Sequence, residues 1–252
     1  MIDKLRHMAR TLLPKSLVGV LRGRSEGARL VLHPDFLTRF KLARSFQLAT
    51  EGIDCTQSEP ESMLVARILL SLPRIINGDV AECGCFMGGS TAKYSHVCGA
   101  LGRRLKVFDS FQGLPEEKAG KPYYNFIDKV NVSWTRGDYQ AGLATVRRNV
   151  AAFGLPEVVD WVPGFFEESL PGWQGQLAAI ILDVDLVEST KTALRYLYPR
   201  LSSGGLVFSQ DAHLEPIVEL FENETFWRDI SGLAPPKFVG LHREKMVYAW
   251  KP

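Results

Sequence analysis

The chain has 252 residues, a formal net charge of +2, 46% hydrophobic residues and 23% charged residues. These values are ordinary for a globular protein, and the length is enough for one large α/β domain with a smaller appendage. So balanced a charge gives no general reason to expect a nucleic-acid partner. Four cysteines at irregular spacing are too few for a disulfide scaffold. No apolar run approaches the ~18–20 residues of a membrane span and no secretory signal is recognisable, so we predict a cytoplasmic protein.

Basic residues are concentrated in the N-terminal part of the chain. Residues 1–45 hold ten Lys and Arg against three acids, and residues 2–22 place leucines at roughly helical spacing among the basic side chains. Such a helix can lie on an anionic membrane, pack on the body of the protein or pack on a second subunit. We therefore predict an N-terminal helical extension over residues 1–57 with a lid, dimer or peripheral membrane role, followed by one domain over residues 58–252. A homodimer is the expected assembly.

The remaining chain alternates strand patterns with helix patterns. Helices are expected at residues 36–50, from Ser58 to Pro73, and at 90–98, 141–153, 188–198 and 215–227; strands are expected at 79–83, 105–109, 158–162, 177–183, 206–209 and 245–250. Residues 116–140 form a polar insertion without periodicity, typical of a lid or substrate loop, and residues 202–205 predict a turn. Five strand-helix units and a terminal strand predict an α/β fold with a doubly wound, mostly parallel sheet.

Acidic residues end four of the predicted strands. In a doubly wound sheet, ligands bind at the carboxyl ends of the strands, where this chain places Glu82, Asp109, Asp183 and Asp211. A pyrophosphate beside Glu82 would be repelled, and the dinucleotide spacing fails because Phe86 stands where a glycine is needed. S-adenosylmethionine fits better, because it carries a sulfonium, an ammonium and a ribose diol but no phosphate.

The glycine-rich turn after the first strand is the predicted binding loop for this donor. Gly84 and Gly88 would let the backbone approach the methionine portion, and Glu82 would favour its ammonium group. Asp109 would accept hydrogen bonds from both ribose hydroxyls. A tight turn with solvated acids is the alternative interpretation.

The acids of the later strands predict a second centre. Asp183 and Asp211 end adjacent strands, and a hard divalent cation such as Mg²⁺ would offset their repulsion, with Gln210 adding a carbonyl oxygen. The metal would lower the pKa of a substrate hydroxyl, and a free carboxylate or His213 would take its proton. An acid pair without metal, and a His213 that only caps the next helix, are the alternatives left open.

Five collinear segments resemble the macrocin O-methyltransferase family. They are Glu82-x-Gly84-x-x-x-Gly88-Gly89-Ser90, Asp109-Ser-Phe-x-Gly-Leu-Pro115, Pro163-Gly-Phe-Phe-x-x-Ser-Leu-Pro171, Asp183-x-Asp185-Leu-x-Glu188-Ser-Thr190 and Tyr198-Pro-x-Leu-x-x-Gly-Gly205. The resemblance covers about residues 75–215. It implies a Rossmann-like class I methyltransferase fold with an antiparallel terminal strand. It also implies methylation of sugar hydroxyls on macrolide and aminocoumarin antibiotics with S-adenosylmethionine and Mg²⁺.

The resemblance also implies roles for individual residues. Cofactor contacts are implied for Glu82, Gly84, Ser90, Asp109 and Ser110, with the adenine near Gly164 and Phe165; metal ligation is implied for Asp183 and Asp211, and a base role for Asp183.

Two departures from the family pattern affect the metal. The family usually has Asp-Gly-Asp-Leu-Tyr where this chain has Asp183-Val-Asp-Leu-Val187, and a paired Asp-Asp where this chain has Gln210-Asp211. One ligand is thus an amide instead of a carboxylate. We predict an S-adenosylmethionine-dependent, metal-assisted O-methyltransferase that acts on a hydroxyl of a glycoside or related small natural product. A metal-independent methyltransferase of a carboxylate or nitrogen, and a non-catalytic S-adenosylmethionine-binding module, are the alternatives.

Overall fold

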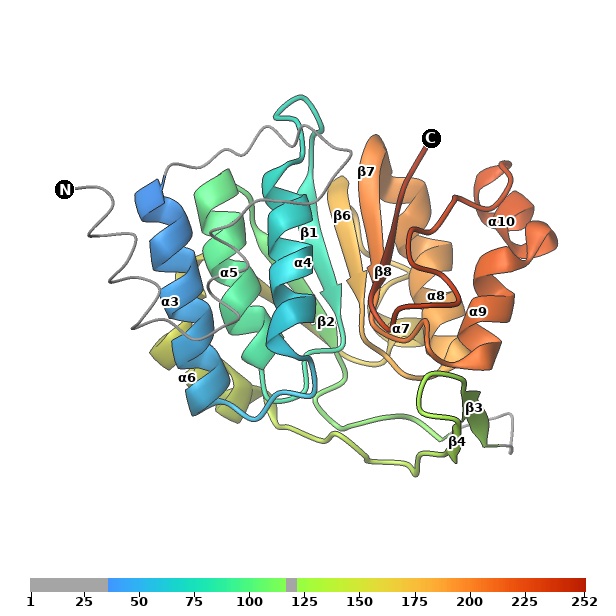
Figure 1. Cartoon of the computed structure of the whole chain (residues 1–252), viewed down its shortest axis with the longest axis horizontal. Coiled ribbons are helices and arrows are strands. Elements are labelled where there is room, and N and C mark those ends of the chain that lie inside the picture. The colour runs from blue at the N-terminus through green and yellow to red at the C-terminus, as the bar shows by residue number, and fades with distance from the viewer. Residues whose placement is uncertain (1–35, 117–121) are drawn as a thin grey trace.

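One six-stranded sheet with helices on both faces forms the body of the protein (Figure 1). The computed structural model describes residues 36–116 and 122–252, so the helix predicted over residues 2–22 lies outside the described residues. The strand order is β5-β2-β1-β6-β7-β8, and all neighbours are parallel except β7 and β8. The strands are β1 (Asp79–Cys83), β2 (Leu105–Asp109), β5 (Val159–Pro163), β6 (Leu177–Leu182), β7 (Leu201–Ser209) and β8 (Val247–Trp250). This confirms the predicted doubly wound sheet with an antiparallel terminal strand.

Two hydrophobic cores lie on opposite faces of the sheet. Along β1, Val80 packs into one core and Ala81 into the other, and Ala179 and Ile180 of β6 alternate in the same way. One core is covered by α3 (Phe36–Gly52), α4 (Glu59–Leu70), α5 (Gly89–Leu101) and α6 (Leu143–Phe153); the other is covered mainly by α8 (Val187–Leu197), α9 (Glu215–Glu222) and α10 (Glu224–Ser231), with the short α7 (Phe166–Ser169) beside them. All six residues of β6 are buried, as expected of a central parallel strand.

Local capping explains where two of these helices begin. The backbone N–H of Ser58 donates to the Glu61 carboxylate at 2.8 Å, the reciprocal half of a capping box, and α4 starts at the next residue as predicted. The single helix predicted over residues 215–227 is instead two helices. Asn223 ends α9 and then caps α10, because its side chain accepts the N–H of Phe226 at 2.9 Å.

Two connections differ from the sequence prediction. Residues 202–205 do not form a separate turn but lie within β7, where Leu201 pairs with Leu177 and Leu206 with Ala179, so the intervening residues form a bulge. The polar insertion contains a small hairpin of β3 (Tyr123–Asn125) and β4 (Val130–Val132). Strands of three residues are too short to give a recognisable alternation.

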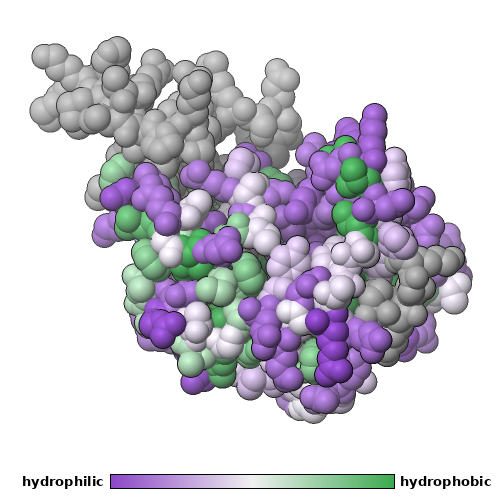
Figure 2. All heavy atoms as spheres, turned by 90° about the horizontal axis from the view of Figure 1, so that it is seen from below, coloured by the Kyte–Doolittle hydropathy of each residue, from purple (hydrophilic) through white to green (hydrophobic). Residues whose placement is uncertain are grey.

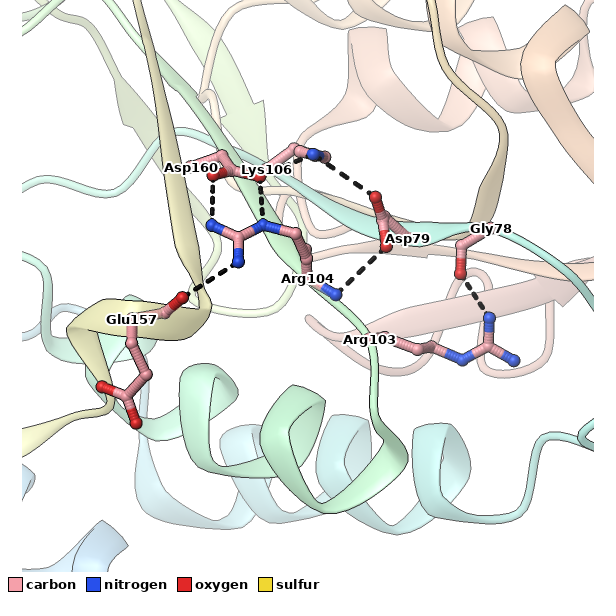
Figure 3. Close-up of polar contacts among 7 residues, drawn as sticks. All are labelled: Gly78, Asp79, Arg103, Arg104, Lys106, Glu157 and Asp160. Atoms are coloured by element: carbon pink, nitrogen blue, oxygen red, sulfur yellow. Dashed lines mark hydrogen bonds and ion pairs between the residues drawn. The ribbon is translucent and has the colours of Figure 1, made fainter.

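Charged side chains at the amino ends of β1, β2 and β5 are paired with one another (Figure 3). Arg104 and Lys106 both bind Asp160, with 2.6 Å between the lysine Nζ and Oδ2, and Lys106 lies 3.4 Å from Asp79. Hydrogen bonds from the Arg104 guanidinium and from Lys106 lower the pKa of Asp160 to about 2. This network ties three neighbouring strands together at one edge of the sheet.

The carboxyl ends of the parallel strands meet at the opposite edge, which Figure 2 views from below. Hydrophobic residues on that face lie in small separate groups among hydrophilic ones. Among residues 36–116 and 122–252, no helix has the length and apolarity needed to cross a membrane.

Candidate active site

A cleft with about 990 Å³ of empty volume, part of it open to solvent, lies at the carboxyl ends of the parallel strands. It is lined by the loops after β1, β2, β5 and β6, by Asp54, Cys55 and Thr56 between α3 and α4, and by Lys245 before β8. Eight of the sequence-predicted site residues line it: Gly84, Ser90, Asp109, Ser110, Gly164, Phe165, Asp183 and Asp211. Four do not: Glu82, Gly88, Gln210 and His213. From the roles that the sequence predicts for them, we call the part around Gly84, Asp109 and Gly164 the donor half, and the part around Asp183, Asp185 and Asp211 the acceptor half.

Gly84 and Gly88, the two glycines predicted to approach the donor, both allow close packing in the loop after β1. Gly84 has φ +82°, and a Cβ there would lie 1.9 Å from the Asp183 carbonyl oxygen, so only glycine lets the loops after β1 and β6 approach this closely. Gly88 has φ +84°, and its Cβ would lie 2.9 Å from Val146 of α6. Gly88 therefore positions the start of α5 against α6 and leaves the cleft lining to Gly84 and Gly89.

Asp109 joins the loops after β1 and β2. Its Oδ2 accepts the N–H of Cys85 at 2.8 Å and its Oδ1 accepts the N–H of Phe111 at 2.7 Å. Each carboxylate oxygen has a second lone pair, so both remain able to accept a ligand hydroxyl. Ser110, in contrast, uses its hydroxyl within the turn, donating to the Gly113 carbonyl at 2.9 Å. The sequence gives no sign of this bridging role of Asp109.

Glu82 lies beneath the donor half with one oxygen unused. The side chain is buried, Oε2 accepts the Thr91 hydroxyl at 2.7 Å, and Oε1 has no hydrogen-bond partner among the residues that the structure describes. Burial raises the pKa of Glu82 to about 7. A buried acid with an unpaired oxygen is costly unless a ligand completes it. Glu82 lies behind the cleft lining, whereas Asp109 and Gly84 are part of it.

Three carboxylates line the acceptor half. Asp211 Oδ2 accepts the N–H groups of Val184 and Asp185 at 2.9 and 3.1 Å, which fixes the loop after β6 beside the end of β7. Asp185 has a left-handed φ of 59°, a conformation that costs energy in a residue other than glycine and is common at functional sites. The tight loop thus brings Asp183 and Asp185 to the same cleft as Asp211.

Burial and mutual repulsion change the acidity of this cluster. Burial and the charge of Asp211 raise the pKa of Asp183 well above its ordinary value and that of Asp185 to about 8. Burial also raises the pKa of Asp211 to about 6, against its two backbone hydrogen bonds. The positive charge of Lys245 acts in the opposite direction on all three. Lys245 was assigned to a strand in the sequence analysis, and no motif marked it as a site residue.

Residues 68–235 match the macrocin-O-methyltransferase family, and they make up more than half of the chain. The chain belongs to this family. It is therefore an S-adenosylmethionine-dependent O-methyltransferase, as the resemblance implied. The family accounts for a donor half and an acceptor half in one cleft, because methyl transfer needs both substrates side by side.

Two relatives and one solved structure illustrate this membership. The 8-demethyl-8-(2,3-dimethoxy-α-L-rhamnosyl)-tetracenomycin-C 4'-O-methyltransferase of Streptomyces olivaceus is 35% identical over 181 residues, which are 63% of this chain and 69% of that one. The demethyldecarbamoylnovobiocin O-methyltransferase of Streptomyces niveus is 33% identical over 56% of this chain and 55% of its own. The O-methyltransferase NovP superposes with a TM-score of 0.58 and 24% identity, over 84% of this chain and 79% of that one, which shows the shared class I methyltransferase fold.

Of the three predicted metal ligands, Asp183 and Asp211 line the cleft and Gln210 does not. Gln210 is buried outside the cleft, where its Nε2 donates to Glu61 at 3.2 Å and its Oε1 accepts from Gln57 at 3.4 Å. Over the described parts of the chain, no group of three His, Cys, Asp or Glu side chains is arranged to hold a metal ion. The set of Asp183, Gln210 and Asp211 is therefore corrected to a pair without the amide, because Gln210 satisfies its polar atoms near α4. The remaining pair of Asp183 and Asp211 can still fit Mg²⁺, which usually keeps several waters and takes one or two protein carboxylates.

His213 is not positioned as the base either. Its imidazole is buried outside the cleft, with Nδ1 lacking a hydrogen-bond partner within the described ranges. Burial, and secondarily the charge of Lys245, lower the pKa of His213 to about 4, so it is neutral near pH 7. Its carbonyl oxygen accepts the N–H of Phe126, which holds the β3–β4 hairpin to the end of β7. In this structure His213 therefore contributes to packing and does not line the cleft.

Proposed function

We propose that this enzyme methylates a sugar hydroxyl of a glycosylated natural product. The name of the Streptomyces olivaceus relative describes a rhamnosyl-bearing acceptor of this class. The observation that carries the proposal is the juxtaposition, in one cleft, of a donor half and an acceptor half whose acids can take a proton. The empty volume of about 990 Å³, part of it open to solvent, is in the range of small-molecule sites.

In the donor half, Asp109 would bind the ribose diol and Glu82 would balance the ammonium group. Both assignments use carboxylate oxygens that can accept a further hydrogen bond. Gly84 and Ser90 would border the methionine portion, and Gly164 with Phe165 would border the adenine. Gly164 suits this because its φ of 128° favours glycine, which has no side chain to obstruct a flat ligand.

In the acceptor half, Asp183 would act as the general base. Bound S-adenosylmethionine supplies an electrophilic methyl group and leaves as S-adenosylhomocysteine. The acceptor hydroxyl donates to an Asp183 carboxylate oxygen, which keeps the proton as the new ether bond forms. Desolvation makes the ionised carboxylate a stronger base than a solvated one. Asp211 holds the loop that presents Asp183, through its hydrogen bonds to Val184 and Asp185. Asp183 and Asp211 would hold a magnesium ion, which would lower the pKa of the acceptor hydroxyl.

An acceptor screen tests the proposal. Wild-type protein with S-adenosylmethionine and a panel of rhamnosylated and other deoxysugar-bearing aromatic and macrolide compounds is expected to give products one methyl group heavier, with the methyl on the sugar. Asp229→Asn, an exposed change on α10, is the matched control for acid substitutions and should keep full turnover. Methylation of free carboxylates or amines, with none of the glycosides accepted, would overturn the acceptor class.

We also propose a homodimer and a peripheral membrane contact through residues 1–22, supported by the basic charge and leucine spacing of that segment. A cytoplasmic location is proposed with them. The division at residues 57 and 58 also remains a prediction. Light scattering of the full chain, with and without anionic vesicles, separates a dimer from a membrane-bound form.

A further inference from the structure

We infer that Phe86 and Tyr139 form an aromatic wall of the cleft, against which the apolar C–H face of the acceptor sugar packs. This rests on the proposed function, because it names residues that would bind the acceptor in the same cleft. Phe86 belongs to the loop after β1 and Tyr139 to the polar insertion, and both line the cleft. The wall would determine specificity by orienting the sugar, and it would take no part in proton transfer.

The two rings of the wall contact each other edge to face. Their centroids lie 5.6 Å apart and their planes are inclined by 79°. Aromatic side chains prefer this arrangement, and it leaves ring faces that the partner ring does not cover. Phe86 is partly buried, whereas 41% of Tyr139 is exposed. An aromatic side chain with that much exposure in a cleft supplies apolar area that a ligand can cover.

The backbone around Tyr139 holds it at the cleft. Gly113, in the loop after β2, has φ +80°, and a Cβ there would lie 2.5 Å from the Gly137 carbonyl oxygen. Only glycine therefore lets the insertion approach this loop so closely. The N–H of Leu114 donates to the Asp138 carbonyl at 2.8 Å, and the N–H of Gly137 donates to the Leu114 carbonyl at 3.0 Å. The residue just before the tyrosine is thus tied to a loop of the donor half.

Both residues of the wall adopt a left-handed backbone conformation. φ is 45° at Phe86 and 59° at Tyr139. This conformation costs energy in a residue with a bulky side chain, and residues that adopt it cluster at ligand-binding sites. Two such residues from distant parts of the sequence, with their rings in contact in one cleft, are therefore consistent with a wall built for a ligand.

The neighbouring acids indicate which part of the acceptor meets the wall. Burial, and secondarily the charge of Asp185, raise the pKa of Tyr139, so its hydroxyl group lies within the electrostatic influence of the acceptor half. In the proposed mechanism the hydroxyl to be methylated lies at Asp183, and the atoms next to that hydroxyl belong to the sugar ring. Equatorial hydroxyls project sideways from such a ring and leave C–H bonds on its faces. The sugar ring is therefore the part beside Tyr139, and the aglycone lies farther out.

Ligand-observed NMR on the full chain, saturated with S-adenosylhomocysteine in the presence of MgCl₂, tests the wall with methyl and phenyl α-L-rhamnoside as probes. Tyr139→Asn removes the ring, and asparagine tolerates the left-handed backbone. It should weaken binding of both glycosides by about five- to tenfold, the size of one aromatic packing contact, and leave affinity for S-adenosylhomocysteine unchanged. Tyr139→Phe should bind like the wild type, because the ring remains. Tyr124→Asn, at a tyrosine with 40% exposure outside the cleft lining, is the matched control and should also bind like the wild type.

Steady-state kinetics separate a binding role from general damage to the fold. With a glycoside that the acceptor screen identifies, Tyr139→Asn should raise KM by the same factor and leave kcat close to the wild-type value, because the wall contacts ground state and transition state alike. A fall in kcat with KM unchanged would contradict the inference.

Two binding results would also overturn the inference. One is unchanged affinity of Tyr139→Asn for both glycosides, and the other is a loss confined to the phenyl glycoside, which would assign the wall to the aglycone. Phe86→Leu removes the other ring and should weaken both glycosides in the same direction, so it decides the case in which Tyr139→Asn does not fold. Failure of the proposed function is distinguishable, because the wild type itself would then bind neither glycoside.

Discussion

Acidic side chains at the two edges of the sheet differ in their ion pairing and in the direction of their pKa shifts. At the amino edge, Asp160 is bound by Arg104 and Lys106, and its pKa falls to about 2 (Figure 3). At the carboxyl edge, Glu82 keeps an unpaired oxygen, and burial raises its pKa to about 7 and that of Asp185 to about 8. Paired acids stabilise the folded chain, whereas buried, poorly paired acids cost stability. Acids with raised pKa values are typical of functional sites, so this difference indicates that ligands bind at the carboxyl edge.

Asp183→Asn should give the largest effect at the carboxyl edge. Without the carboxylate that accepts the hydroxyl proton, turnover should fall by about 10²–10⁴-fold. Affinity for S-adenosylhomocysteine and the melting temperature should stay close to wild type, because the substitution removes a buried charge and keeps the shape. Calorimetry and a turnover assay on the same preparation check this. Equal losses of binding and turnover would contradict the division into donor and acceptor halves.

Asp109→Ala should weaken the donor half strongly. It removes the acceptor for the ribose diol and two backbone hydrogen bonds, each to a charged group worth about 1.5–3 kcal/mol. Affinity for S-adenosylhomocysteine should fall at least about tenfold, measured by calorimetry. Asp229→Asn serves as the control, and unchanged affinity in Asp109→Ala would remove Asp109 from the site.

A pH series on S-adenosylhomocysteine binding should give a smaller, graded effect. Glu82 has a folded pKa raised to about 7, so below pH 7 it is mostly protonated and binding an ammonium group must release that proton. Affinity should therefore rise from pH 5.5 to 7 and level off above pH 7.5, by at most about tenfold per pH unit. Glu82→Gln should flatten the curve. A wild-type affinity that falls over this interval would show that Glu82 does not face the ammonium.

Asp160→Asn should give the smallest effect. The ion pairs are partly exposed, so the loss of unfolding free energy at pH 7 should be about 1 kcal/mol or less and should shrink further in high salt. Because the pKa of Asp160 is depressed, its contribution is present above about pH 4 and is lost as the pH falls toward 2. Turnover should not change. A large loss of turnover would contradict the conclusion that only the acids at the carboxyl edge take part in the reaction.

The sequence predicted the elements that periodicity and capping define. β1 and β2 have the predicted bounds, and α4 begins beside Ser58, since alternation and cap residues are local signals. The break at Asn223 was missed although its cap is local, whereas the bulge in β7 depends on pairing with the distant strand β6. The hairpin in the insertion is too short to give a pattern.

Some residues of the site could likewise be predicted from the sequence and others could not. Asp109, Asp183 and Asp211 could be placed because strand-end acids in a parallel sheet converge on one edge. Gln210 and His213 were misplaced because side-chain direction after a strand end is set by tertiary partners, here Gln57 and the buried surroundings of the imidazole. Lys245 approaches from the antiparallel end of the chain, where no rule about strand ends applies.

A crystal structure of the complex with S-adenosylhomocysteine tests the central claim most directly. The account predicts ribose hydroxyls on Asp109, the amino group toward Glu82 and the thioether sulfur facing Asp183. A nucleoside bound elsewhere, or a sulfur directed away from Asp183, would contradict a cleft that joins methyl donor and acceptor base.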